Sequence, residues 1–312
     1  MIITCPKCAR KHKVNPDIIQ VHIDSGKNIS ATCRSCKYKF PVLMDQLIDR
    51  SSTEKQTQGQ KARKICVTLS KGGVGKTTTC VNLGAGLALA GYRVLLVDTD
   101  TQGQSSYILG KKPNAGLTEL LTKELTPAEC IVNARKNLWL LGGGKSLAGV
   151  KRIIDRKSFG AEWTLAEAME PLDHQYDFIL MDTSPGWDQL IVNVLFYATE
   201  VLVPVALEVM PLHGLSEFMK SLGSIQKYRN EISLKYIVPT FLDTRIKGPQ
   251  VLYSELKKLY PEYVCTPIRY SESLSEAPSF GKTIFEFAPG SFASADYREL
   301  VRKVSRDDTA LV

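Results

Sequence analysis

The residues with the clearest chemical meaning form one run, Lys71-Gly72-Gly73-Val74-Gly75-Lys76-Thr77-Thr78. Glycines let a backbone curl so that successive N–H groups point at one anion. The amine of Lys76 can then reach the β and γ phosphates of a nucleotide, and the hydroxyl of Thr77 can bind Mg²⁺. The pattern therefore predicts a site for ATP and magnesium that is built from all eight residues of the run.

A second chemical pattern lies near the N-terminus, where two C-x-x-C pairs are separated by 24 residues. Two such turns present four thiolates, which is the usual ligand number of structural Zn²⁺. We predict a zinc ribbon over residues 1–50 whose metal supplies the stability that so small a core lacks. The alternatives are a redox pair and an iron–sulfur cluster. The predicted ligands are Cys5, Cys8, Cys33 and Cys36.

The other four cysteines, Cys66, Cys80, Cys130 and Cys265, stand among apolar residues. Cysteines in such surroundings usually pack as small core residues, which is typical of proteins in a reducing compartment.

The phosphate-binding run must be positioned by a strand before it and a helix after it. Six short runs are apolar throughout, which is typical of strands that helices bury on both faces. Thr126, Pro127 and Glu129 predict a capped helix start, and Gly91 predicts a helix end after residue 90. Alternating strands and helices indicate a doubly wound, mainly parallel α/β sheet. The apolar runs are 65–69, 94–97, 138–141, 178–181, 201–205 and 236–238.

Composition separates the chain into three parts. Residues 51–64 hold a single apolar side chain, Ala62, so we expect a flexible linker between the ribbon and an ATPase domain at 65–312. Residues 1–64 carry 13 Lys or Arg and 5 Asp or Glu, whereas residues 65–312 carry 27 of each, so the formal net charge of +8 lies in the arm. A basic arm favours nucleic acid or another acidic partner, although a merely solvated surface is the alternative.

The phosphate run departs from the strict P-loop pattern, because Ser70 replaces a glycine and a second lysine, Lys71, precedes the glycine pair. In this form, K-G-G-V-G-K-T-T, it resembles the ParA/MinD family of dimerising ATPases. That resemblance implies an ATP-sandwich dimer in which Lys71 reaches the partner's phosphates and Lys76 those of its own subunit. An additional cation there stabilises the charge of the transition state.

The resemblance extends to two acidic strand ends. The stretch D-T-D-T-Q-G at 98–103 is similar to the family's switch, with Thr101 in place of proline. It implies that Asp100 orients the attacking water and that Asp98 supports the site. Asp182 ends a strand similar to Walker B and would hold Mg²⁺ through water, although an Asp at this place can also be a helix cap.

Further segments of the resemblance imply base contacts by Asp243 and Arg269. One departure concerns DNA: DNA-binding relatives often have an arginine where Ser273 stands. This argues against DNA binding through that surface, unless nearby basic residues compensate. Those residues are Arg245, Lys247, Lys257 and Lys258.

Taken with the resemblance, these residues predict a slow Mg-dependent ATPase that dimerises with ATP and positions or partitions a cargo. The expected partners are a second copy of the chain, non-specific DNA, and a ParB-like or cargo-adaptor protein that stimulates hydrolysis. The alternatives are a DNA-binding regulator that acts through the ribbon, a metallocluster carrier and a MinD-like membrane ATPase. The last is disfavoured by the narrow apolar stripe near the C-terminus. We expect a cytoplasmic protein that associates with the nucleoid through DNA.

Overall fold

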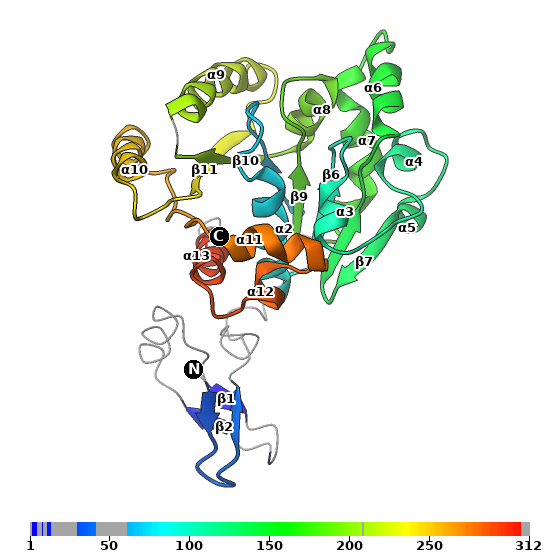
Figure 1. The fold of residues 1–312 in the computed structure, drawn as a ribbon. Coiled ribbons are helices and arrows are strands. Elements are labelled where there is room, and N and C mark those ends of the chain that lie inside the picture. The colour runs from blue at the N-terminus through cyan, green and yellow to red at the C-terminus, as the bar shows by residue number, and fades with distance from the viewer. Residues whose placement is uncertain are drawn as a thin grey trace.

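The structure, a computed structural model, describes residues 2–4, 8, 11–13, 30–41, 61–207 and 209–306. Within this part of the chain, the main sheet has seven strands in the order β11-β10-β5-β9-β6-β8-β7 (Figure 1). All neighbours are parallel except β7 and β8. The strands are β5 (Arg63–Val67), β6 (Val94–Asp98), β7 (Ile131–Arg135), β8 (Leu138–Leu141), β9 (Phe178–Asp182), β10 (Glu200–Ala206) and β11 (Ser233–Thr240).

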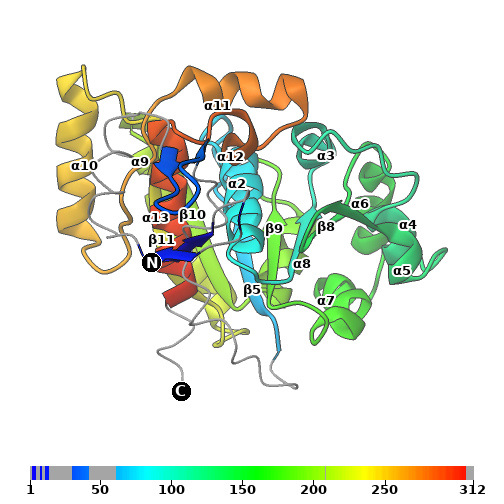
Figure 2. The same ribbon diagram turned by 90° about the horizontal axis from the view of Figure 1, so that it is seen from below.

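Helices cover both faces of this sheet (Figures 1 and 2). One core cluster joins one face to α2, α3, α11, α12 and α13, and a second joins the other face to α4, α6, α7, α8 and α9. The helices are α2 (Lys76–Leu89), α3 (Gln104–Ile108), α4 (Leu117–Leu121), α5 (Pro127–Cys130), α6 (Leu147–Asp155), α7 (Thr164–Met169), α8 (Gln189–Tyr197), α9 (Val209–Gln226), α10 (Lys247–Leu259), α11 (Glu272–Glu276), α12 (Ile284–Phe287) and α13 (Phe292–Arg306). Short 3₁₀ turns are η3 (Ala161–Trp163), η4 (Glu170–Leu172) and η5 (Ala277–Phe280).

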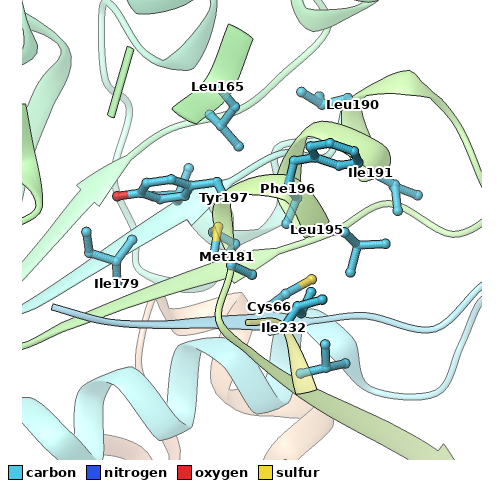
Figure 3. Packing of buried hydrophobic residues seen from close by; sticks show 14 of the residues in the cluster. Cys66, Leu165, Ile179, Met181, Leu190, Ile191, Leu195, Phe196, Tyr197 and Ile232 are labelled. Carbon is cyan, nitrogen blue, oxygen red and sulfur yellow. The ribbon is translucent and has the colours of Figure 1, made fainter. Parts of the chain in front are cut away.

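Figure 3 shows how one face of the sheet packs under α8. Side chains from the central strands β5 and β9 meet apolar side chains from α7 and α8, and all of them are buried. Burying this much apolar surface is the main contribution to the stability of such a layer. The labelled side chains are Cys66, Leu165, Ile179, Met181, Leu190, Ile191, Leu195, Phe196, Tyr197 and Ile232.

The six predicted buried strands are all present, and the prediction of a mainly parallel, doubly wound sheet is confirmed. The capped start at Thr126 is also present, because the Glu129 carboxylate accepts from the Thr126 N–H at 2.9 Å, although α5 is only one turn long. The strand β7 was not predicted. Its residues are mostly half-exposed, so the continuous apolar run that marked the other strands is absent there.

The ATPase domain begins earlier than the sequence suggested. The strand β5 starts at Arg63, and Ala62 is already buried, so residues 62–64 do not belong to a linker. The composition was misleading because the charged Arg63 and Lys64 are largely covered in the fold, where they form ion pairs with Glu200 at 2.6 Å and Asp173 at 3.1 Å. With this boundary, residues 1–62 carry 11 Lys or Arg and 5 Asp or Glu, which leaves an arm of +6.

In the arm, two antiparallel pairs are described, β1 (Ile2–Thr4) with β2 (Lys11–Lys13) and β3 (Ser30–Thr32) with β4 (Lys39–Pro41). Each pair is short and flanks one of the C-x-x-C turns. At the other end of the chain, the apolar stripe of α13 is buried in the core beside α2, as expected from packing. None of the described helices combines the length and the apolar character that crossing a membrane requires.

Candidate active site

The phosphate loop lies between β5 and α2, at the edge of the sheet where the parallel strands end. Gly73 and Gly75 have φ angles of 75° and 83°, a left-handed backbone that glycine adopts without steric cost. The loop therefore curls before α2 begins at Lys76. The N-terminus of a 14-residue helix then faces the loop, and its free N–H groups favour an anion.

The two lysines of the loop lie in different surroundings. Lys76 is 7% exposed, and its ammonium donates to the Lys71 carbonyl at 2.7 Å. Burial lowers the pKa of Lys76, while Asp182 and Asp100 act in the opposite direction. The Lys71 side chain is exposed, so its amine is available to a group outside this subunit.

Asp98 and Asp182 lie side by side, because they are paired across β6 and β9. Asp98 is fully buried and accepts from the backbone N–H groups of Asp100 at 2.9 Å and Ser105 at 3.1 Å. The Ser105 hydroxyl donates to Asp182 Oδ2 at 3.0 Å. Burial raises the pKa of Asp98 well above its ordinary value and that of Asp182 to about 7.

The buried Asp182 Oδ1 atom has no hydrogen-bond partner in the part of the chain that the structure describes. An unpartnered buried carboxylate oxygen is unfavourable, and a cation or its bound water would satisfy it. The Thr77 hydroxyl acts on the same carboxylate and lowers its pKa. An oxygen-only pair of this kind suits Mg²⁺, so the residues present fit the predicted ion.

Asp100 lies at the start of the loop after β6 and is 8% exposed. Its Oδ1 atom accepts from the Gln102 N–H at 3.0 Å. Its carbonyl accepts from the N–H groups of Gly103 at 3.1 Å and Gly144 at 3.0 Å. The structure thus brings Asp98, Asp100, Asp182 and Lys76 to one edge of the sheet, as expected for residues that follow neighbouring parallel strands.

A hollow of about 1040 Å³ opens beside this cluster and begins at Thr78, in the first turn of α2. Its aromatic walls suit a flat ring such as a nucleobase. Of the two predicted base contacts, Asp243 lines the hollow, while its carboxylate holds Arg245 at 2.7 Å. The residues that line the hollow are Thr78, Gln102, Gln104, Tyr107, Ile108, Phe241, Asp243, Arg245, Ile246, Tyr270, Ser271, Leu274, Ser275 and Pro278.

Arg269, the other predicted base contact, is not among these residues. Its guanidinium donates to the buried Asp296 at 2.6 Å and stacks over the Phe292 ring at 4.5 Å. The pair ties the segment after β11 to α13. In this structure Arg269 therefore holds α13. Asp243 and the aromatic residues are the ones that line the hollow.

Sequence reasoning missed three residues near this site. Ser105 has no motif, but a hydroxyl shortly after an acidic strand end could have suggested a carboxylate partner. Phe241 and Tyr270 line the hollow, yet aromatic residues in loops carry no pattern that distinguishes them from core residues. The uninterrupted glycine run at 142–144 is a further signal in the sequence, although no role was predicted for it.

The arm brings three sulfur atoms together. The thiols of Cys8, Cys33 and Cys36 lie within 4.8 Å of one another, and the Sγ atoms of Cys8 and Cys33 are 3.6 Å apart. The fourth predicted ligand, Cys5, lies outside the described residues. The Cys36 backbone N–H donates to Cys33 Sγ and lowers the pKa of that thiol to about 5.

The chain is similar to known proteins over most of its length. A sequence profile described as an AAA domain matches residues 62–235. The chromosome-partitioning ATPase Soj of Thermus thermophilus is 37% identical over 246 residues, which are 78% of this chain and 96% of that protein. The sporulation initiation inhibitor protein Soj of Bacillus subtilis is 36% identical over 249 residues, which are 77% of this chain and 97% of that protein.

Among solved structures, the cobyrinic acid a,c-diamide synthase of Mycobacterium smegmatis with bound ADP and magnesium has a similar fold, with a TM-score of 0.69. The two sequences are 27% identical, and the match covers 80% of this chain and 97% of that one. Each similarity thus spans nearly the whole of the other protein.

Proposed function

The chain belongs to the ParA/MinD family of ATPases that position cellular cargo, and we propose that its switch is a dimer that forms only with ATP. The observation that carries this proposal is the contrast between the two loop lysines. Lys76 is buried beside the carboxylate cluster, whereas Lys71 is exposed at the same loop. A pair of subunits that face each other through these loops would place each Lys71 on the other subunit's phosphates.

In this scheme each residue of the cluster has one role. The backbone of residues 71–78 and the Lys76 amine bind the phosphates, because N–H groups and a buried cation stabilise concentrated negative charge. Asp100 orients the attacking water, and Asp98 fixes the Asp100 backbone by accepting its N–H at 2.9 Å. Thr77, and Asp182 through water, would hold Mg²⁺, which would supply positive charge against the phosphates.

The hollow beside Thr78 takes the adenosine part of the nucleotide. Its wall combines aromatic rings with the Asp243 carboxylate, a mixture that suits a base and a ribose. Arg269 supports this wall through α13.

The switch acts with other macromolecules. We expect a ParB-like protein or a cargo adaptor to trigger hydrolysis, since a slow ATPase needs a signal that ends the dimer state. The protein would work in the cytoplasm and associate with the nucleoid while it holds DNA. The cargo is a chromosome, a plasmid or a large protein assembly.

We further propose that the arm binds one Zn²⁺ through Cys5, Cys8, Cys33 and Cys36. The three described sulfur atoms support this, because a 4.8 Å group of thiols matches one face of a tetrahedral thiolate site. The metal would order an arm whose described strands are only three residues long.

The second candidate function is a DNA-binding regulator in which the ATPase sets the dimer state and the arm contacts DNA. The observation that favours it is the formal charge of +6 on residues 1–62. The exposed side chains of Arg34, Lys37 and Lys39 belong to this charge. Both candidate functions share the same ATP switch, so they differ only in what the dimer holds.

Two variants test the ATP switch. Lys76→Ala should abolish ATP-dependent dimerisation, because it removes a buried phosphate contact. Asp100→Ala should still dimerise with ATP but hydrolyse it about 10²-fold more slowly, the order of effect of losing one positioning group. Static light scattering and phosphate release measure the two quantities. A wild-type protein that stays monomeric with ATP, or an Asp100→Ala protein with full activity, contradicts the scheme.

A further inference from the structure

A second glycine loop, residues 142–144, lies against the segment that carries Asp100. It follows β8 directly and leads into α6. The Gly144 N–H donates to the Asp100 carbonyl at 3.0 Å. This loop therefore contacts the backbone of the proposed water-orienting residue, although it is 42 residues further along the chain.

Gly143 makes the closest approach. A Cβ atom at this position would lie 2.6 Å from the Asp98 carbonyl oxygen, 2.7 Å from the Asp100 carbonyl oxygen and 2.9 Å from Asp98 Oδ1. Atoms at these distances overlap, and two of the three belong to the backbone, which cannot rotate away. Any side chain at position 143 must therefore displace the segment that carries Asp98 and Asp100.

The loop cannot move away from that segment, because its other side is also filled. A Cβ atom on Gly142 would lie 2.8 Å from the Pro113 Cγ atom. The Gly142 carbonyl accepts from the Leu117 N–H at 2.8 Å. A Cβ atom on Gly116 would lie only 2.2 Å from that carbonyl oxygen. The loop is thus held between the start of α4 on one side and Asp98 and Asp100 on the other.

The loop is also tied to the phosphate-loop side of the site through α6. The Leu147 N–H donates to the Gly144 carbonyl at 3.0 Å. One helical turn later, Lys151 forms an ion pair with Asp188 at 2.6 Å. Asp188 is the last residue of the loop between β9 and α8. In the same loop, the Gly186 N–H donates to the Ser70 carbonyl at 2.8 Å. The glycine loop therefore lies in a continuous chain of contacts around the active site.

We propose that Gly143 is a positioning residue for hydrolysis, which holds the backbone of Asp98 and Asp100 so that the Asp100 carboxylate faces the attacking water. The inference rests on the role of Asp100 proposed above. Gly143 has no side chain that could touch the nucleotide. Its contribution is the close approach that only glycine allows, and it acts on turnover rather than on phosphate binding.

The test compares Gly143→Ala with Gly149→Ala, because Gly149 lies on α6 with nothing within 4 Å of an added Cβ atom. Gly143→Ala should lower kcat at least 10-fold, while KM for MgATP and ATP-dependent dimerisation change less than about twofold. Gly149→Ala should keep wild-type values. Full kcat in a folded Gly143→Ala protein overturns the proposal. A loss of dimerisation in parallel with kcat also overturns it, since that places the effect on nucleotide binding.

A double variant separates this inference from the role of Asp100. If Gly143 acts through Asp100, the Gly143→Ala/Asp100→Ala protein should be no slower than Asp100→Ala alone. A double variant in which the two losses multiply overturns the inference and leaves the role of Asp100 intact. If Asp100→Ala alone keeps full activity, the proposed role of Asp100 is wrong, whatever the effect of Gly143→Ala.

A milder substitution covers the case in which Gly143→Ala does not fold. Pro113→Ala removes the ring that confines Gly142 and adds no volume. It should lower kcat several-fold at unchanged KM, because the loop gains room to retreat from Asp100. The proposal is overturned if Gly143→Ala does not fold and a folded Pro113→Ala protein keeps its kcat. Gly143 would then have only a structural role.

Discussion

At the start of the ATPase domain, the Arg63 side chain hydrogen-bonds residues of three other elements. It donates to both oxygens of Glu200, at 2.7 and 2.6 Å, to the Tyr236 hydroxyl at 2.9 Å and to the Val304 carbonyl at 2.6 Å. The last bond also satisfies a carbonyl in the final turn of α13. One guanidinium thus joins β5, β10, β11 and the C-terminal helix at the edge of the sheet opposite the phosphate loop.

Glu200→Gln tests this residue. The substitution leaves a largely covered cation with a neutral partner that can still accept a hydrogen bond. We therefore expect the free energy of unfolding to fall by about 2–3 kcal/mol, toward the lower end of the effect of removing one partner of a buried pair. ATP turnover per folded molecule should not change, because the pair is remote from the nucleotide. Urea unfolding followed by circular dichroism gives the first quantity.

The matched control is Glu299→Gln, which removes the exposed partner of Arg302 and should cost less than about 1 kcal/mol. If the two substitutions lower the free energy of unfolding equally, the Arg63–Glu200 pair stabilises the protein no more than an ion pair at the surface does.

The sequence could predict those site residues that a local motif contains. Lys76, Asp100 and Asp182 each follow a buried strand in a recognisable order, and the structure brings them together. The sequence carries only weak signals for Ser105 and Gly143, because their contacts with Asp182 and Asp98 form only in the folded sheet. Arg63 falls within the predicted linker, because its partner Glu200 is 137 residues away and does not show in the local composition.

At the scale of elements, the strands that were predicted are those with apolar residues on both faces. The strand β7 escaped because it is an edge strand with a mixed burial pattern. The strand β11 is longer than the predicted 236–238, because the polar residues Ser233 and Lys235 interrupt the apolar run at its start, although the strand pairs with β10 from Ser233 onward. Helix caps were predictable from Thr126 and Glu129, whereas α10 and α11 carried no start signal strong enough to use.

The proposed zinc site lies in the arm, where Cys8, Cys33 and Cys36 are close together. We predict one zinc per chain, and deletion of residues 1–50 should remove it without loss of ATP turnover. The variant Cys33→Ser/Cys36→Ser should also lose the metal, because it removes two of the four thiolates. Cys130→Ser is the matched control, since that buried thiol lies outside the group. Elemental analysis decides the matter, and stoichiometric zinc in the deleted protein would place the metal elsewhere.

At the scale of the whole molecule, the arm joins the ATPase at Arg63, whereas the phosphate loop lies at the other end of β5. Five residues of strand separate the two points by roughly 16 Å. If two subunits meet through their phosphate loops, the two arms leave from the outer ends of the dimer. Such an arrangement presents two separated basic contacts to one polymer, and joint binding raises the effective local concentration.

This geometry predicts how DNA binding depends on ATP and salt. With ATP, the full chain should bind DNA more tightly than residues 61–312, and its affinity should fall more steeply with salt, because more phosphate contacts release more counterions. Without ATP the difference should shrink. Fluorescence anisotropy across a salt series measures both slopes.

The control for DNA binding is the full chain with Lys257→Gln and Lys258→Gln, which lowers the charge of α10 and leaves the arm intact. Equal affinities and slopes for the full chain and residues 61–312 would assign the arm to a protein partner instead.

The placement of the cysteines has a consequence for chemical labelling. Cys66, Cys80, Cys130 and Cys265 are all at most 3% exposed, and burial raises the pKa of the first three thiols. Since alkylating reagents attack the thiolate, these positions should stay unmodified in the native protein. Cys8 is exposed. A maleimide dye should therefore mark the arm alone, and if the proposed zinc is bound there, a chelator should raise that reactivity without any engineered cysteine.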